Sequence, residues 1–453
     1  MKKQWTSVQT IGAFLGIVLM LFAWCNLLGP VAGMGGADYY QVASGGFHLM
    51  SANNCQTYFP SIPPEDSYRG TMNWILRPLS SAFPGLDVRV LATVYFLAVV
   101  LVFAWFLKKL KPEKNWYLFL IAGVAGFIFC DFAYLLHLNS LNPQGAFYGI
   151  ILVMVSLLLL QMHHKTGLLK TVIYLFLCFM ISGLKTGYWW IGVLFAVLLL
   201  PTFYLRKDAL YRGVTLGLTV VTCIGCVVCY GDGVYYQKDQ QNLFHSAYYG
   251  VLKENPDPQA ISKLGLPEAA KEYSGKTIYD VSESVVDDRT LQTSYGKIMG
   301  YYLTHPKQFL DKLECSADNG YEIRQQYVSN YPDGDRLKYG FNLYSAIKRR
   351  FMQPDLWFVL VFLGAVAIYC ALQVKKAIEA SKKAHYLFLV LLCVVTLVTF
   401  VSPVIISGQA ALDAELFLYN LLFDIVLCHV IVGGTITLTK RRENIQKKYG
   451  VQQ

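Results

Sequence analysis

The sequence predicts an all-α polytopic membrane protein, with about ten transmembrane helices and a small, mainly helical domain outside the cytoplasm. Of its 453 residues, 55% are hydrophobic and only 15% are charged, whereas about a quarter of a soluble protein's residues are charged. The hydrophobic residues form long uninterrupted blocks, and lysine and arginine gather in short stretches between them. This pattern indicates membrane spans joined by loops.

The expected spans follow from the length of the apolar runs, because a helix needs about 20 mostly apolar residues to cross a bilayer. They are 8–30, 88–107, 115–136, 146–162, 171–187, 188–205, 213–231, 355–373, 386–405 and 417–438. Lys185 interrupts the apolar run 171–205. This run forms either two short spans that meet outside or a re-entrant pair, and both alternatives leave the later spans in the same orientation.

The distribution of basic residues predicts the topology. With the N-terminus in the cytoplasm, every connection rich in lysine and arginine falls on the cytoplasmic side, as the positive-inside tendency requires. These connections begin at Lys108, His163, Arg206 and Lys375, and the termini carry MKK and KRRENIQKK. We therefore expect both termini in the cytoplasm. We favour a retained first span over a cleaved signal peptide, because its apolar run is long for a signal.

The net charge of +10 raises the question of nucleic-acid binding. The largest polar stretch, 232–354, is close to neutral, and the basic excess lies in the short connections instead. The charge is thus a topology signal, and we expect the lipid bilayer rather than nucleic acid as a partner.

Three regions follow from these spans. Residues 1–231 form an N-terminal transmembrane module with a long first outside loop, 31–87, and 355–453 form the C-terminal helices and a cytoplasmic tail. Residues 232–354 form an outside domain. The first loop is rich in glycine, proline, asparagine and tyrosine, which predicts loop with short helices. Amphipathic stretches at 291–303 and 307–319 predict a mainly helical outside domain that rests on the membrane.

The eleven cysteines lie mostly inside apolar blocks. Cys223, Cys226 and Cys229 are spaced like a metal motif, but a cysteine in an apolar helix packs as a small hydrophobe, and no histidine or second cysteine pair lies near. Cys55 and Cys315 fall in the outside segments, where a disulfide and two free thiols are both open. We expect no metal site at these cysteines.

Acidic residues at the outer boundary are the first candidates for chemistry. Asp38 follows span one in a glycine-rich stretch, where an acid with a raised pKa acts as a general base; the alternative is a solvated loop acid. Asp131 is the only acid of span three, and acids in spans usually face a cavity or a partner; the alternative is an acid at the interface. His137, Asn139 and Asn142 follow it and make this end of the span polar.

Basic and aromatic residues lie at the same boundary. Lys185 either snorkels to the interface or contacts a phosphate, which a point cation suits. Arg77, where the first loop returns to the membrane, raises the same question. Arg349 and Arg350 lie outside, against the positive-inside tendency, as a solvated pair or as contacts for an anionic ligand. Trp189 is either an interface-belt residue or a platform for a lipid or sugar.

Two further acids, Asp413 and Glu415, lie in the last outside loop, and Asp424 is a lone acid a few residues deeper in the last span. The alternative for Asp413 and Glu415 is an ordinary polar turn. Taken together, acids, a lysine and an arginine gather at the outer boundary of several spans. A substrate with a phosphate on a lipid tail would bind at this depth, with its polar head outside.

At these residues the chain resembles the bacterial GT-C-type membrane glycosyltransferases, in particular the glycan-biosynthesis hexose transferases. Asp38 matches the acid of the family's first outside loop. The stretch from Asp131 through Tyr134 to Asn139 and Ser140 resembles a D-x-x-Y-x-x-x-x-N-S motif. Lys185, in LKTGYWWIGVLFA, resembles a lysine motif at the start of a later span, and ELFLYNLLFD resembles the opening of the last span.

The sequence also departs from the family pattern in two places. Gln144 stands where a glutamate often follows the N-S pair, and no Lys-His pair precedes the last span. These departures concern acceptor binding, and they are also compatible with a specialised or inactive member.

The resemblance implies a transferase in a bacterial plasma membrane. It implies a polyprenyl-phosphate sugar as donor and a glycan as acceptor outside the cytoplasm. Asp38 is then the general base, and Asp131 orients the acceptor or holds a divalent cation, Mg or Mn. The residues expected at the lipid phosphate are Lys185, Arg77, Arg349 and Arg350, and those expected at the acceptor are Tyr134, His137, Asn139 and Trp189.

Two other classes of function are open. A transporter or flippase of a lipid-linked sugar also needs charges near the lipid, but it should show internal repeats and broken helices near the midplane, and no repeat is visible. An envelope assembly protein without catalysis does not explain Asp131 and Lys185 within apolar blocks. The position of the charges at one boundary favours the transferase.

Overall fold

The structure is a computed structural model of the chain. It describes residues 11–12, 14–16, 18, 71, 88–110, 112, 114–138, 143–163, 167–185, 188–206, 208–230, 240, 242–253, 258–281, 293–323, 342–352, 355–410 and 412–449.

The described part is built from helices, and it contains no β-strand. The longer helices are α5 (Val88–Lys109), α6 (Trp116–Phe129), α8 (Pro143–His163), α9 (Leu168–Ser182), α10 (Trp189–Val197), α11 (Ala209–Tyr230), α14 (Tyr295–Thr304), α15 (Pro306–Asn319), α16 (Leu343–Phe351), α17 (Leu356–Lys376), α18 (Ala380–Ile406) and α20 (Phe417–Tyr449). The short ones are α7 (Phe132–Leu138), η1 (Leu200–Tyr204), η2 (His245–Val251), α13 (Pro258–Leu264), η3 (Glu268–Tyr273), η4 (Ile278–Asp280) and α19 (Leu412–Glu415).

Six of these helices are long and apolar enough to cross a membrane: α5, α8, α11, α17, α18 and α20. Three shorter apolar segments, 116–129, 168–182 and 189–204, complete the set. These nine coincide with nine of the ten expected spans, and the remaining one, 8–30, lies mostly outside the described residues. The prediction of an all-α polytopic membrane protein is thus confirmed. The run interrupted by Lys185 is two short helices, α9 and α10, packed against each other.

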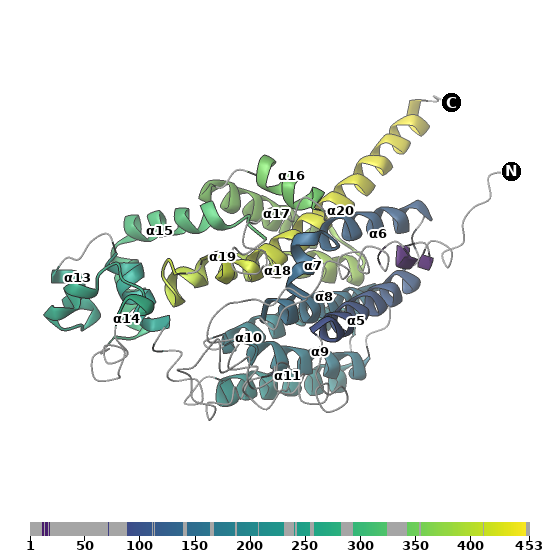
Figure 1. The fold of residues 1–453 in the computed structure, drawn as a ribbon. Coiled ribbons are helices and arrows are strands. Elements are labelled where there is room, and N and C mark those ends of the chain that lie inside the picture. The colour runs from purple at the N-terminus through teal and green to yellow at the C-terminus, as the bar shows by residue number, and fades with distance from the viewer. Residues whose placement is uncertain are drawn as a thin grey trace.

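Helix α8 lies at the centre of the bundle. It is buried over almost its whole length, and it contacts α5, α7, α9, α18 and α20. Helices α9, α10 and α11 pack together on one side of it, whereas α17, α18 and α20 form a second group (Figure 1). The outer faces of α11 and α17 are lined with exposed valine, leucine and isoleucine. Such faces suit contact with lipid chains rather than water.

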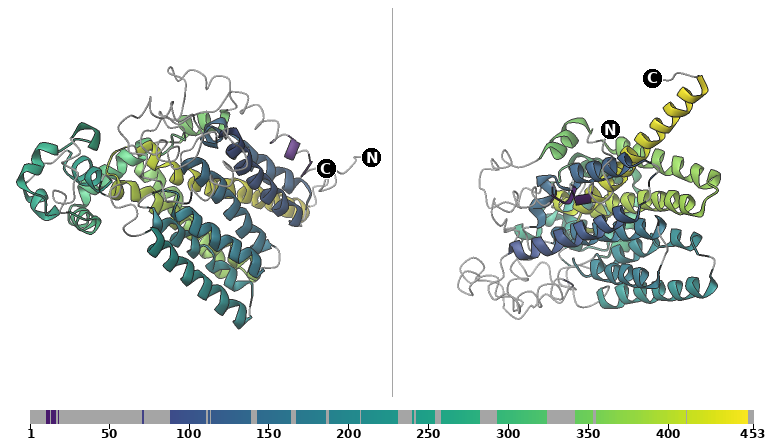
Figure 2. Two further views of the ribbon diagram at one scale, coloured as in Figure 1. Left: turned by 60° about the horizontal axis from the view of Figure 1, so that its bottom comes forward. Right: turned by 90° about the vertical axis from the view of Figure 1, so that its right-hand side faces the viewer.

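The helices of the predicted outside domain lie at one end of the bundle. Helices α13, α14 and α15 gather there, and the last turns of α20 extend from the opposite end (Figures 1 and 2). The stretches predicted as amphipathic helices, 291–303 and 307–319, coincide with α14 and α15. Helix α15 packs against α17 and α18, which places this region directly on the transmembrane helices. The domain boundaries 1–231, 232–354 and 355–453 stay a prediction.

The lysine-rich connections converge at the other end. Lys108 and Lys109 close α5, Lys375 and Lys376 close α17, and Lys114 forms an ion pair with Glu443 near the end of α20. One end of the bundle therefore carries the basic residues that the topology argument places in the cytoplasm.

A glycine allows α9 and α10 to approach closely. A Cβ on Gly192 of α10 would lie 2.1 Å from the Cys178 carbonyl oxygen and 2.1 Å from the Ser182 hydroxyl oxygen. Small residues at such contacts let backbones meet inside a membrane, where helix association depends on packing and interhelical hydrogen bonds. Ser182 donates a hydrogen bond to the Trp189 carbonyl (2.8 Å) across the same contact.

Gly192→Ala should therefore lower the melting temperature, because the added methyl group forces the two helices apart. Overpacking of this kind destabilises by about 1–3 kcal/mol. Gly364→Ala is the matched control, since a Cβ there meets no atom within 4 Å and alanine favours the helix. Thermal unfolding of the purified variants in detergent measures both. Equal melting temperatures for the two variants would contradict the close packing of α9 and α10.

Candidate functional site

The structure describes seven of the ten predicted site residues. Asp38, Arg77 and Asn139 lie outside the described residues, so their predicted roles stay predictions. The described ones are Asp131, Tyr134, His137, Lys185, Trp189, Arg349 and Arg350. They fall into separate groups rather than one cluster.

Asp131 joins the starts of two helices. Its carboxylate is buried, with one oxygen accepting from the Ala133 backbone N–H (2.9 Å) in the first turn of α7. The other oxygen accepts from the Ser345 backbone N–H (3.0 Å) in the first turn of α16. The first N–H groups of a helix have no partner within it, and side-chain oxygens commonly satisfy them. This environment of N–H donors suits helix capping, and it does not suit a cation, which needs oxygen ligands.

Tyr134 belongs to a buried network around Asp424. The Tyr134 hydroxyl donates to one Asp424 oxygen (2.5 Å), and Lys348 Nζ lies 2.7 Å from the other. Lys348 also donates to the Asn420 side-chain oxygen (2.8 Å). The side chains of Lys348 and Asp424 are both 0% exposed. This network fastens α16 to α20 and α7, and its side chains have no access to solvent.

Lys348 was not among the predicted residues. In the sequence it reads as one of three consecutive basic residues with Arg349 and Arg350, which favours a solvated group. The sequence feature that could have indicated a buried cation is Asp424, since a lone acid in a span requires a partner.

His137 is also enclosed. Its Nε2 lies 2.9 Å from the Ile323 carbonyl oxygen, and its ring packs on Phe417 with the ring centres 4.4 Å apart. It therefore connects α7, the end of the α15 segment and the start of α20. The predicted contact of His137 and Tyr134 with an acceptor stays a prediction, and both side chains are packed in protein.

Lys185 is a predicted site residue that is partly exposed and lies in direct contact with an acid. Its ammonium pairs with Glu415 of α19, and the Tyr188 hydroxyl donates to the other oxygen of the same carboxylate. Lys185 Nζ also lies 4.9 Å from the centre of the Tyr188 ring, a cation–π distance. The side chains of Lys185 and Glu415 are 19% and 9% exposed. We call Lys185, Tyr188, Glu415 and Gln144 the outer cluster.

A small cavity opens within the outer cluster. It has about 10 Å³, room for about one water molecule, and it is lined by Gln144, Phe147, Lys185, Tyr188, Glu415, Phe417 and Leu418. The side-chain oxygen of Gln144 is buried and has no hydrogen-bond partner among the described residues. Gln144 stands where the transferases that the sequence resembles often have a glutamate. It lines the same small cavity as Lys185.

His245 lies within electrostatic reach of the outer cluster. Its Nε2 accepts from the Ile278 backbone N–H (3.0 Å), which leaves the proton of a neutral ring on Nδ1. Burial lowers the pKa of His245, whereas the nearby charges of Glu415 and Asp280 act in the opposite direction. The residue opens η2, a π-helical turn, a form that often occurs at functional sites.

The remaining predicted residues are Trp189, Arg349 and Arg350, which are not part of the outer cluster. Trp189 is half-buried in the first turn of α10. Arg349 is 77% exposed with its guanidinium 4.0 Å from Glu322, and Arg350 is exposed. The described residues contain no group of three or more histidine, cysteine or acidic side chains that could hold a metal ion. Cys223, Cys226 and Cys229 form no disulfide. The two alternatives for Cys55 and Cys315 stay open, because Cys55 lies outside the described residues.

A family model described as the YfdI N-terminal transmembrane domain matches residues 70–451. The chain belongs to this family. No curated protein and no solved structure matches the chain.

The match to the YfdI N-terminal transmembrane domain supports a multi-pass membrane protein. It spans the outer cluster, the Lys348–Asp424 pair and the helices of the predicted outside domain. Asp38 precedes the matched residues.

The Lys348–Asp424 pair provides a stability test. Lys348→Met leaves a buried carboxylate without its cation, which destabilises by about 3–5 kcal/mol. The double variant Lys348→Met/Asp424→Leu removes both charges, so we expect it to be more stable than either single variant. Thermal unfolding in detergent measures all three, and Arg349→Met, an exposed neighbour, should stay at the wild-type melting temperature. Additive losses in the double variant would contradict a coupled ion pair.

Proposed function

We propose that this protein is a GT-C-type membrane glycosyltransferase. It moves a hexose from a polyprenyl-phosphate-linked donor to a glycan or cell-envelope polymer outside the cytoplasm, in a bacterial plasma membrane. The observation that carries this proposal is the outer cluster. A lysine held by a carboxylate lies at the end of the bundle opposite the lysine-rich connections. In the proposed orientation this end is the outer boundary of the membrane, where the phosphate of a lipid-linked donor would lie.

The geometry of Lys185 suits a phosphate contact. A point cation suits phosphate, and Glu415 and Tyr188 hold this cation in place before a ligand arrives. When a donor binds, the phosphate takes a position beside the ammonium and shares it with Glu415. A prepositioned cation stabilises the charge that develops on the leaving phosphate without reorganising at the moment of reaction.

The proposed glycosyl transfer forms one bond and breaks one bond at the anomeric carbon of the donor. An acceptor hydroxyl oxygen attacks the anomeric carbon of the donor sugar and loses its proton to the carboxylate of Asp38. The bond between that carbon and the phosphate oxygen breaks, and its electron pair leaves with the polyprenyl phosphate. Lys185 stabilises this phosphate, with Arg77 as a second candidate contact. The resemblance supports the role of Asp38, which lies outside the described residues.

Lys185→Met tests the phosphate contact. Loss of a group that stabilises the leaving charge slows reactions by about 100-fold or more, so the donor should accumulate. The measurement is lipid mass spectrometry on cells lacking the protein and rescued with each variant. We expect a polyprenyl-phosphate hexose to build up with no rescue, with Lys185→Met and with Asp38→Asn, and to be cleared by the wild type.

Lys382→Met is the matched control, because Lys382 also pairs with a carboxylate, that of Glu379 (3.0 Å), but at the lysine-rich end. It should clear the donor as the wild type does. If Lys185→Met clears the donor equally well, Lys185 is not the phosphate contact. A deletion that changes only the side of the membrane on which the lipid-linked sugar is found would instead support a flippase. An assembly protein would leave the lipid pool unchanged.

The proposed orientation has a separate test, with both termini in the cytoplasm and α13 to α15 outside. In a background with all eleven native cysteines replaced by serine, Glu272→Cys should react with a membrane-impermeant maleimide in intact cells, since residue 272 is exposed on η3. Lys382→Cys, exposed at the lysine-rich end, should react only after permeabilisation. The reverse labelling pattern would overturn the orientation.

A further inference from the structure

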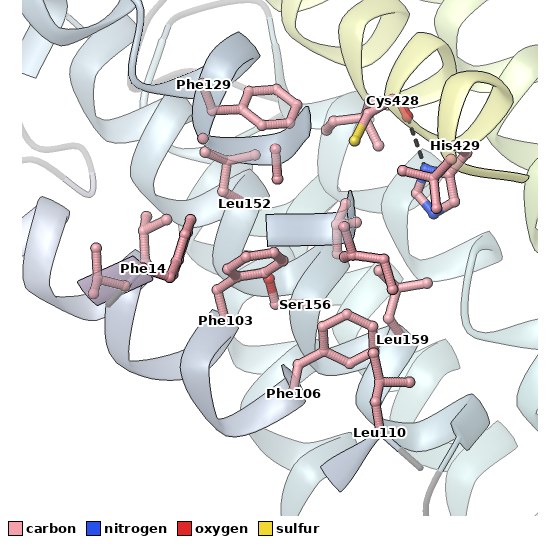
Figure 3. Close-up of a pocket in the computed structure, with 18 of the residues that line it drawn as sticks. Phe14, Phe103, Phe106, Leu110, Phe129, Leu152, Ser156, Leu159, Cys428 and His429 are labelled. Atoms are coloured by element: carbon pink, nitrogen blue, oxygen red, sulfur yellow. Dashed lines mark hydrogen bonds between the residues drawn. The ribbon is translucent and has the colours of Figure 1, made fainter. Parts of the chain in front are cut away.

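A second feature is a long apolar cavity between α5, α6, α8 and α20, whose lining on α8 begins at Tyr148, directly after the last α8 residue of the small cavity, Phe147. It has a volume of about 300 Å³. Figure 3 shows Phe103 and Phe106 of α5, Leu152 and Leu159 of α8, and Phe129 of α6 around it. Along α8 the lining runs from Tyr148 to His163, about 22 Å at 1.5 Å per residue. One leaflet of a bilayer is about 15 Å deep, so the cavity is long enough for a lipid chain.

The polar groups of this cavity lie mainly at one end. His163 closes α8, His385 lies in the first turns of α18, and His429 lies on α20, and all three line the cavity. The ring centres of His163 and His385 are 5.7 Å apart, as are those of His385 and His429. His429 donates from Nδ1 to the Ile425 carbonyl (2.7 Å). In contrast, Nδ1 of His385 is buried and has no hydrogen-bond partner among the described residues.

The charge around this end is basic. Among the described residues, no aspartate or glutamate lines the cavity, and Lys109 precedes the lining residue Leu110 at the end of α5. Three described acids of the lysine-rich end have partners: Glu379 pairs with Lys382, Glu443 pairs with Lys114, and Asp208 accepts from the Leu210 backbone N–H (3.0 Å). An apolar channel that ends in imidazoles within a basic surface complements an amphiphile with an anionic head.

We infer that this cavity binds one anionic phospholipid from the leaflet on the lysine-rich side. An acyl chain lies along α8, and the phosphate accepts a hydrogen bond from Nδ1–H of His385 beside His163. This lipid is distinct from the proposed donor, whose phosphate lies at the opposite end of the bundle. The inference does not depend on the proposed function.

Two neighbouring glycines of α20 allow a matched test. A Cβ on Gly433 or on Gly434 would meet no atom within 4 Å, so both tolerate a larger side chain. Only Gly433 lines the cavity. Gly433→Leu therefore fills the space of the lipid chain, whereas Gly434→Leu makes the same chemical change beside it. His385→Leu removes the phosphate donor without filling the channel.

Native mass spectrometry of the full chain, purified in a neutral detergent and mixed with equal amounts of phosphatidylglycerol, phosphatidylcholine and diacylglycerol, gives the readout. We expect the wild type and Gly434→Leu to retain one phosphatidylglycerol in preference to the other two lipids. His385→Leu should reduce retention about tenfold, the equivalent of one hydrogen bond to a charged group. Gly433→Leu should also reduce retention, because its side chain occupies the space of the lipid chain. A melting curve checks that each variant is folded, and if Gly433→Leu is not, His385→Leu decides.

Three results would overturn the inference. Equal retention by the two glycine variants would mean that the lipid is not in the cavity. Equal retention of the three lipids would mean that no anionic head is recognised. Displacement of phosphatidylglycerol by an equal amount of polyprenyl phosphate would assign the cavity to the donor lipid instead.

Discussion

Helix α8 shows the constraint on which the rest of the structure depends: inside a membrane, backbone polar groups must be satisfied by the protein itself. The helix packs against α5, α7, α9, α18 and α20, among others, and lipid chains provide little hydrophobic drive to hold these helices together. Close packing of the helix backbones at small residues holds the helices together instead. A Cβ on Gly149 of α8 would lie 3.1 Å from the Cβ of Tyr95, and one on Gly145 would lie 2.4 Å from the His137 carbonyl oxygen.

The polar side chains at the end of the bundle opposite the lysine-rich connections divide into two kinds by their access to solvent. Lys348 and Asp424 are fully enclosed and satisfied by Asn420 and Tyr134. A buried pair of this kind is expensive to break but adds little to stability compared with an apolar contact, so its effect is to specify where α16 sits on α20. Lys185 and Glu415 are partly exposed beside a cavity, which leaves them able to exchange partners with a ligand.

The bundle also has two chemically different ends. At the end opposite the lysine-rich connections, the ammonium of Lys185 pairs with the Glu415 carboxylate, which also accepts from the Tyr188 hydroxyl. Toward the lysine-rich end, His163, His385 and His429 line an apolar cavity. The two proposals above place one phosphate at each of these ends.

The sequence by itself determined the class of fold and the register of the spans. The transfer of about 20 apolar residues into hydrocarbon is a local property, and so is the break that Lys185 makes between α9 and α10. The partners of the polar residues were decided only by the tertiary structure. Asp131 meets Ser345 across 214 residues, and Lys348 meets Asp424 across 76. No local pattern distinguishes a lysine that is buried against a distant acid from its solvated neighbours, because burial depends on which helices pack together.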